Sequence, residues 1–121
     1  MKKVLLPTDF SENSLNAIKY AVQLFENEDC TFYLLNTYTP TVYYIEYVPV
    51  STNPSGLSDV IKENNLKNLE HIVEKIQSEY KNPKHHFEII AAFNTLILEI
   101  QDLVQEKNID YIVIEIYCLF C

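Results

Sequence analysis

The chain has 121 residues, 48% of them hydrophobic and 21% charged, and we expect a single globular domain that spans residues 1–121. Its 17 acidic and 9 basic residues leave a net charge of −8. This argues against nucleic acid and against an anionic membrane surface as partners, because both attract a surplus of Lys and Arg. No apolar run reaches the roughly 20 residues that cross a bilayer, so we expect a cytoplasmic protein. The three cysteines lack the spacing of a disulfide framework, and we expect reduced thiols.

Residues 2–21 have the pattern of a buried strand, a sharp turn and an amphipathic helix. Residues 4–7 form a short apolar run, which Pro7 ends because it lacks a backbone donor. Ser11 or Asn13 can cap the helix that follows, and the helix is expected to end at residues 27–29. Its apolar residues recur at three-to-four-residue spacing and form a buried stripe: Leu15, Ile18, Val22 and Phe25.

Residues 31–37 are rich in β-branched and aromatic side chains and predict a second strand, parallel to the first because a helix separates the two. From residue 38 to 56 the periodicity fails and prolines recur, which predicts a long, tyrosine-rich loop. Ser55 or Ser58 then caps a helix that runs to about Tyr80.

The last third of the chain continues the alternation of strands and helices. Residues 87–93 predict a third strand, Asn94 or Thr95 caps a third helix, and residues 111–116 predict a fourth strand. The residues of the third helix that we expect to face inward are Ile97, Ile100, Leu103 and Val104.

Alternating strands and helices predict an α/β fold, a doubly wound open parallel sheet with helices on both faces. If the strand order is 3-2-1-4, a crevice opens at the carboxyl ends of the first and fourth strands, where such sheets bind ligands. Asp9 would line one wall and the residues after Ile114 the other. The carboxylate of Asp9 can face a ligand or can belong only to the turn, and we favour the ligand. Gly56 is the one glycine of the chain, whereas loops that cradle phosphates use several.

Other groupings have ordinary explanations, and we expect no catalytic site and no metal site. Cys118 and Cys121 have the spacing of a redox or metal pair, but no second ligand pair accompanies them. Helix capping accounts for Ser11 and Ser14. The three histidines lack a carboxylate or cysteine at matching spacing and are expected at the surface or partly packed: His71, His85 and His86.

Three segments resemble the universal stress protein family: VLLPTDFSENSLNAIKYA, FYLLNTY and NIDYIVI. The resemblance extends to about residue 114 and is closest to the first domain of two-domain bacterial members. It implies a Rossmann-like, adenine nucleotide alpha hydrolase-like sheet of five strands, ATP binding in many members, and dimerisation, commonly through the last strand. The residues that would hold adenosine under this resemblance are Pro7, Thr8, Asp9, Thr37 and Ile114.

The phosphate side departs from the family pattern, which is a Gly-x-x-Gly turn after the fourth strand and another glycine about ten residues later. Glu115 and Cys118 stand at the first two glycines, and the chain stops at Cys121 before the third. A carboxylate at the first position would repel phosphate oxygens. We therefore expect the binding of ATP or AMP to be weak or lost.

The apolar ending, IEIYCLFC, stands where family members continue with a last helix and a fifth strand. A truncated or frameshifted gene and a genuine short form both stay open. We expect the fourth strand to become an exposed edge, through which a homo-oligomer forms or a partner domain binds.

These observations predict a stress-response domain that acts by binding and association and is not an enzyme. Two alternatives stay open. One is an adenine-nucleotide sensor whose phosphate site is completed by a partner chain or second domain. The other is an interaction module that uses the fourth strand and the loop tyrosines: Tyr38, Tyr43, Tyr44 and Tyr47.

Overall fold

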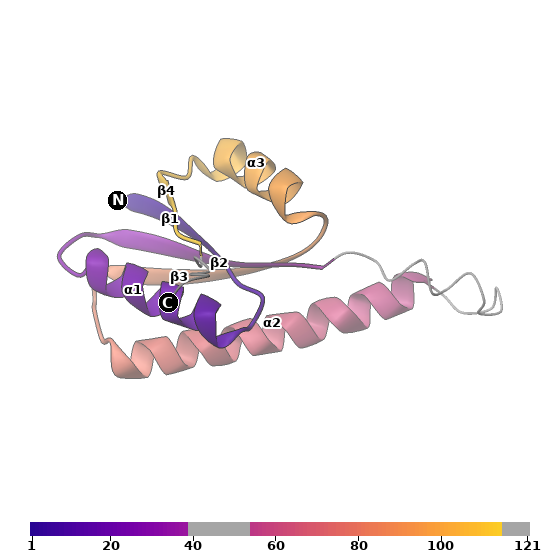
Figure 1. Cartoon of the computed structure of the whole chain (residues 1–121), viewed down its shortest axis with the longest axis horizontal. Helices are drawn as coiled ribbons and strands as arrows, with labels where there is room; N and C mark the ends of the chain where they lie inside the picture. The colour runs from indigo at the N-terminus through magenta and orange to yellow at the C-terminus, as the bar shows by residue number, and fades with distance from the viewer. Residues whose placement is uncertain (39–53, 115–121) are drawn as a thin grey trace, which may run out of the picture.

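The computed structural model describes residues 1–38 and 54–114. These ranges contain, in chain order, β1 (Lys2–Pro7), α1 (Glu12–Leu24), β2 (Cys30–Tyr38), α2 (Pro54–Glu79), β3 (His85–Phe93), α3 (Leu96–Lys107) and β4 (Tyr111–Ile112). The strands form one parallel sheet in the order β3-β2-β1-β4, as expected. α1 and α2 cover one face and α3 covers the other (Figure 1), which confirms the doubly wound α/β architecture.

The first three strands begin earlier than their apolar runs predict. Lys2 pairs with Cys30, and Cys30 pairs with His85 on its other side. The hydrogen bonds between strands are made by backbone groups. A strand can therefore begin before its run of apolar side chains begins.

β4 is shorter than the strand predicted for residues 111–116. Tyr111 and Ile112 pair with β1, and the N–H of Val113 still donates to the Leu5 carbonyl at 3.0 Å. Residue 114 would come opposite Pro7, which has no N–H to donate, and this limits the ladder. Residues 115 and 116 lie outside the described part of the chain.

α1 begins after Ser11, whose hydroxyl oxygen accepts a hydrogen bond from the N–H of Ser14 at 3.2 Å. Ser11 is therefore the N-cap, and the alternative, Asn13, lies inside the helix. The helix ends at Leu24, with Phe25 as its C-cap, a few residues before the predicted end.

α2 begins at Pro54, so the predicted caps, Ser55 and Ser58, are wrong. Proline is favoured in a first helical turn because the N–H it lacks would have no partner there. The predicted loop is correspondingly shorter, since Tyr38 ends β2 and residues 54–56 are already helical. α2 is long enough to extend beyond the strands (Figure 1).

α3 follows Thr95, whose side chain makes no capping hydrogen bond. Thr95 is the N-cap by position, as one of the two predicted candidates. The preceding Asn94 bonds beside it: its oxygen accepts from the N–H of Thr95 at 2.8 Å, and its amide donates to the side chain of Glu99 at 3.0 Å. The inward position predicted for Ile97 is wrong, because this side chain is 70% exposed. Ile97 lies in the first turn, whereas later turns of α3 provide the contact with the sheet.

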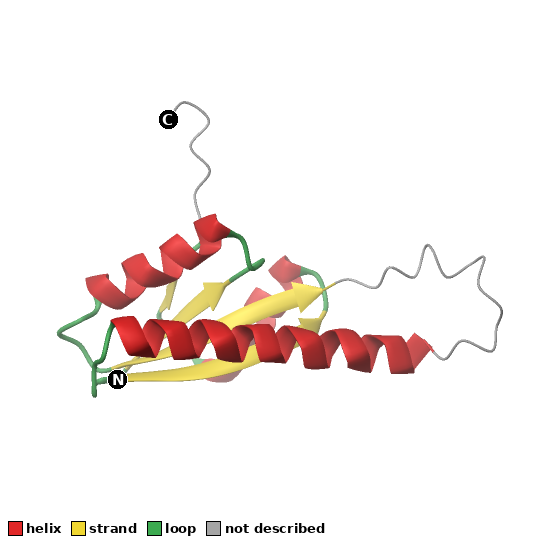
Figure 2. Ribbon diagram, turned by 90° about the horizontal axis from the view of Figure 1, so that it is seen from below, coloured by secondary structure: helices red, strands yellow, loops and turns green. Residues whose placement is uncertain are grey.

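Two cores lie on the two faces of the sheet. The larger core lies under α1 and α2, which run side by side over the same face (Figure 2). The smaller core lies under α3. Among the described helices none is long and apolar enough to cross a membrane. The buried members of the larger core are Val4, Leu6, Ile18, Ala21, Val22, Phe25, Cys30, Phe32, Leu34, Leu69, Ile76 and Ala91, and those of the smaller are Leu5, Tyr33, Leu35 and Leu103.

Candidate functional site

The turn between β1 and α1 is tied to its surroundings through Thr8, which is 7% exposed. The N–H of Thr8 donates to the Leu35 carbonyl at 2.8 Å, and its hydroxyl oxygen accepts from the N–H of Phe10 at 3.1 Å. The Ser14 hydroxyl donates to the Ser11 carbonyl at 2.9 Å, so the Thr8 hydroxyl supplies the proton of the 2.7 Å bond between these two side chains. The hydrogen bonds of the buried Thr8 therefore fix the conformation of the turn.

Phe10 has a φ angle of 66°, in the left-handed region that favours glycine. A bulky residue there stores backbone strain of about 1–3 kcal/mol. The side chain of Phe10 packs against the larger core, which offsets part of this strain. Strained turns of this kind are concentrated at binding sites.

Asp9 lies between these two residues and is exposed. Its Oδ1 accepts a hydrogen bond from the N–H of Ser11 at 2.9 Å. The pKa of Asp9 is lowered from the ordinary value of 3.8, because Ser11 donates to the carboxylate from its side chain and its backbone and so stabilises the charged form. At neutral pH the turn therefore presents a fixed negative charge.

The end of β2 supplies the neighbouring wall through Asn36, which is 6% exposed. Its amide donates to the Thr8 carbonyl at 2.9 Å, and its oxygen accepts from the amide of Asn65 on α2 at 2.7 Å. Asn36 was not among the predicted site residues. The available signal was a polar residue inside an apolar strand, next to Thr37 at the carboxyl end.

One cavity of about 180 Å³ lies at the carboxyl ends of the strands. It brings together all five residues that the resemblance assigned to adenosine. Asn36 and Leu96 complete it and were not predicted. The lining residues are Pro7, Thr8, Asp9, Asn36, Thr37, Leu96 and Ile114.

The cavity has an acidic character, since among the described residues that line it Asp9 is the one with a charge and none is a cation. Several N–H groups of the adjoining turn already have internal acceptors: those of Phe10, Ser11 and Ser14 donate to side-chain oxygens of the turn itself. An anion would find little positive charge in the described part of this wall. Glu115 and Cys118, which the sequence places at the family's glycines, lie outside the described residues.

The chain also matches a known protein family. The model of the universal stress protein family matches residues 1–115. The chain belongs to the universal stress protein family. A search among curated proteins finds no matching sequence.

Solved universal stress protein structures share the fold. UspA from Lactobacillus plantarum is 19% identical with a TM-score of 0.65, over 93% of this chain and 75% of that one. The hypothetical protein MJ0577 is 21% identical with a TM-score of 0.69, over 92% and 71%. A universal stress protein in complex with cAMP is 15% identical with a TM-score of 0.60, over 92% and 69%. At such identities the likeness is evidence for the fold alone.

The remaining predicted groups lie away from the cavity. His71 and His86 are exposed, whereas His85 is buried, so a surface or partly packed position is wrong for His85. Its Nε2 lies 2.8 Å from the Phe25 carbonyl, because β3 begins early enough to carry this ring under α1. Cys30 is buried and free, and burial raises the pKa of its thiol. No group of three metal-binding side chains occurs among residues 1–38 and 54–114.

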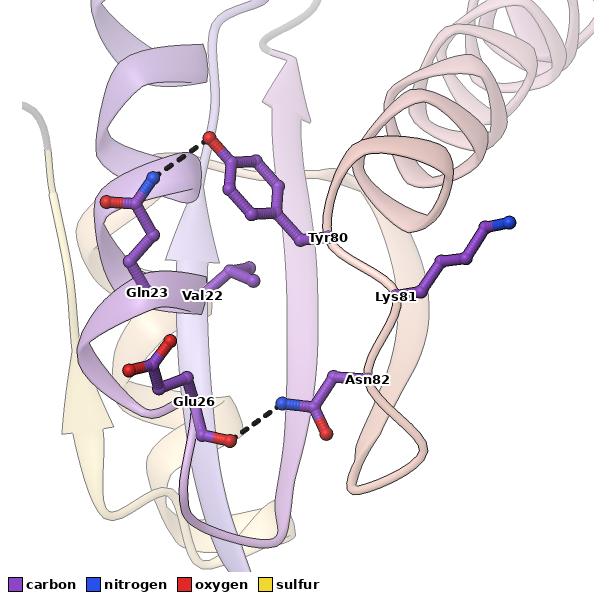
Figure 3. A pocket seen from close by; sticks show the side chains of 6 residues that line it. All are labelled: Val22, Gln23, Glu26, Tyr80, Lys81 and Asn82. Carbon is purple, nitrogen blue, oxygen red and sulfur yellow. Dashed lines mark hydrogen bonds between the residues drawn. The ribbon is translucent and has the colours of Figure 1, made fainter.

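A smaller cavity of about 110 Å³ lies at the opposite end of the sheet, between the end of α1 and the segment after α2 (Figure 3). Gln23 donates to the Tyr80 hydroxyl at 2.9 Å, and the Asn82 amide donates to the Glu26 carbonyl at 2.7 Å. These bonds join the end of α1 and the turn after it to the segment that follows α2. The side chain of Lys81 points away from these bonds (Figure 3), so in this universal stress protein the cavity is bridged by Gln23, Tyr80 and Asn82 without it.

Proposed function

We propose that this universal stress protein acts by reversible binding, and that the cavity at the strand ends holds the adenosine part of an adenine nucleotide. The observation that carries the proposal is the meeting of Asp9, Asn36 and Thr37 with apolar side chains in a cavity whose described lining holds no cation. A cytoplasmic location and a role in stress response belong to the same proposal. The structure of a relative in complex with cAMP supports nucleotide binding within the family.

Adenosine suits this lining because it combines a flat, apolar ring system with hydrogen-bond donors at its edge and on the ribose. The ionised Asp9 accepts hydrogen bonds and cannot donate them, so it selects hydroxyl and amino groups. Leu96 and Ile114 are 37% and 44% exposed and offer apolar surface that a base would cover. Covering such surface contributes about 25 cal/mol per Å².

Phosphate groups would contribute little here. A phosphate oxygen about 4 Å from the Asp9 carboxylate is repelled by about 1 kcal/mol in water and about 4 kcal/mol at an effective dielectric of 20. The binding of a triphosphate normally depends on Lys, Arg or free backbone N–H groups, and the described lining of the cavity has no such cation. We therefore propose that ATP binds weakly unless a partner chain supplies the phosphate side.

Turnover has no support in the described residues. The Ser14 hydroxyl is occupied by the Ser11 carbonyl and by Thr8, and no histidine lies among the described lining residues to act as its base. We propose a binding protein and not an enzyme.

Calorimetry at pH 7 with adenosine, ADP and Mg-ATP tests the proposal. We expect adenosine to bind, and ATP to bind at most about tenfold tighter, since its phosphates add less than about 1.4 kcal/mol. Asp9→Asn keeps the shape and removes the charge, and we expect at least about tenfold weaker adenosine binding. Glu12→Gln is the matched control, because Glu12 is an exposed acid of the next turn outside the cavity.

Two outcomes would contradict the proposal. Absence of heat with all three ligands would exclude a nucleoside pocket. ATP binding a hundredfold tighter than adenosine would show that a phosphate site exists.

A second candidate function is self-association through β4. Tyr111, Ile112 and Ile114 are 45%, 42% and 44% exposed, which leaves an apolar surface on this edge strand. We expect wild-type protein to elute as a dimer in light-scattering chromatography and Ile112→Lys to elute as a monomer. Val60→Lys is the control, because Val60 is 54% exposed on α2 and should not affect assembly. A monomeric wild type excludes this function.

A further inference from the structure

β3 is the edge strand on the other side of the sheet. Two bonds fix the direction of its backbone groups: the N–H of Cys30 donates to the Lys84 carbonyl at 3.0 Å, and the N–H of Asn94 donates to the Tyr38 carbonyl at 3.2 Å. Backbone groups alternate along a parallel strand, so the even-numbered residues of β3 bond to β2. The N–H and C=O groups of Phe87, Ile89 and Ala91 therefore point outward. No described residue pairs with them.

A groove of about 260 Å³ lies beside this open edge, between β3 and α2. Its floor is apolar and its wall on α2 is acidic. The lining residues are Phe87 and Ile89 from β3 and Glu70, Val73 and Glu74 from α2.

The two carboxylates of the groove are not neutralised. Neither Glu70 nor Glu74 has an ion-pair partner among the described residues, and Lys67, one turn before Glu70, makes no ion pair with it. Glu88 is exposed on the opposite face of β3, so both sides of the open edge carry negative charge. The whole chain has a net charge of −8, which adds to this field.

We propose that the outer edge of β3 binds an extended, basic segment of a partner protein as an added strand. The backbone of the segment pairs with the outward N–H and C=O groups of Phe87, Ile89 and Ala91. A Lys or Arg side chain of the segment lies in the groove, its aliphatic stem on Phe87 and Ile89 and its charge between Glu70 and Glu74.

The charges favour this occupant over the others that an open edge admits. A second copy of the chain would bring its own acidic groove and net negative charge to an acidic edge, which is repulsive. Side chains at alternate positions of the segment all lie on one face of the added strand, so basic residues spaced in this way meet the acidic groove on the α2 side. This site lies on a different strand from the adenosine cavity and from β4, so it does not depend on the proposed function.

Fluorescence anisotropy with a labelled peptide of alternating valine and arginine tests the proposal on the full chain. We expect saturable binding that weakens as salt rises, and no binding of the matched peptide with glutamate in place of arginine. The double variant Glu70→Gln, Glu74→Gln should weaken binding about tenfold or more. Glu63→Gln, an exposed acid of α2 outside the groove, should leave it unchanged. Equal affinity of the double variant and wild type for the peptide would overturn the proposed role of the groove.

Strand addition has its own test. Methylation of the peptide N–H groups at alternate positions removes the donors on one edge only. We expect one methylation pattern to abolish binding and the complementary pattern to preserve it. Equal affinity of the two methylated peptides would overturn the proposed backbone pairing. If the protein instead dimerises through β3 and the dimer does not bind the peptide, the edge belongs to a second copy of the chain.

Discussion

At the scale of single residues, the charge of Asp9 links the candidate site to the stability of the fold. Its pKa is lowered in the folded state, so its contribution is present above the unfolded value of about 3.8 and is lost as pH falls through the folded pKa. Asp9→Asn removes this charge-dependent contribution to the free energy of unfolding. We expect wild type to exceed the variant in stability by less than about 1 kcal/mol at neutral pH, because the group is exposed, and the difference to shrink below pH 4.

Urea denaturation of both proteins between pH 3 and pH 7 checks this dependence. Glu12→Gln serves again as the control, since it is an exposed acid in the same segment. A difference that grows as the pH falls would contradict the assigned direction.

Two adjacent histidines offer a matched pair of opposite environments. His85 is 6% exposed, bonds the Phe25 carbonyl through Nε2, and packs edge-on against Phe32 at 4.9 Å between ring centroids. Its Nδ1 is buried without a partner in the described structure. His85→Ala leaves a cavity and removes one of two hydrogen bonds to the Phe25 carbonyl, which still accepts from the N–H of Glu28 at 3.0 Å, and we expect a loss of about 2–4 kcal/mol. His86→Ala should stay within about 0.5 kcal/mol, because His86 is exposed. Equal losses of stability for the two variants in thermal or urea unfolding would refute the buried position of His85 and the exposed position of His86.

At the scale of elements, the two shorter helices differ in how they begin. Ser11 caps α1 with its side chain and also donates to Asp9, whereas Thr95 before α3 makes no side-chain capping bond. Ser11→Ala should therefore cost about 1–2 kcal/mol, and Thr95→Ala less than about 0.5 kcal/mol. Urea midpoints of the two variants measure the difference. A larger loss from Thr95→Ala would show that the caps are assigned wrongly.

The types and order of the described elements could be predicted because each strand is an apolar run and each helix has apolar residues at helical spacing. The boundaries could not. Lys2 and His85 are strand residues because they pair across the sheet, and that pairing is absent from local sequence. Ile97 fits the stripe of α3, yet a stripe does not indicate which turns reach the sheet.

The candidate site was predictable in part for the same reason. The five assigned residues lie at strand ends, which parallel topology brings to one edge, and they do line one cavity. Asn36 and Leu96 were not predicted as site residues because their role depends on neighbours that are distant in sequence. The amide of Asn36 is held by Thr8 and by Asn65, residues on two other elements.

At the scale of the whole molecule, the sheet separates two cores of unequal size, and β2 contributes to both. Leu34 points into the core under α1 and α2, which has twelve buried members among the described residues, and Leu35 points into the core under α3, which has four. Both side chains are fully buried, at 0% exposure. The two residues are thus neighbours in sequence with the same chemistry and opposite surroundings.

We expect Leu34→Ala and Leu35→Ala each to destabilise the fold by about 2–5 kcal/mol, because each deletes buried methyl groups and leaves a cavity. The loss should be larger for Leu34, since the densely packed layer of α1 and α2 relaxes less into the space than the single helix α3. Chemical denaturation of both variants, with Leu98→Ala as a control at a side chain that is 53% exposed, measures the order. A larger loss for Leu35→Ala would mean that the α3 layer, and not the pair of helices opposite, holds the sheet together.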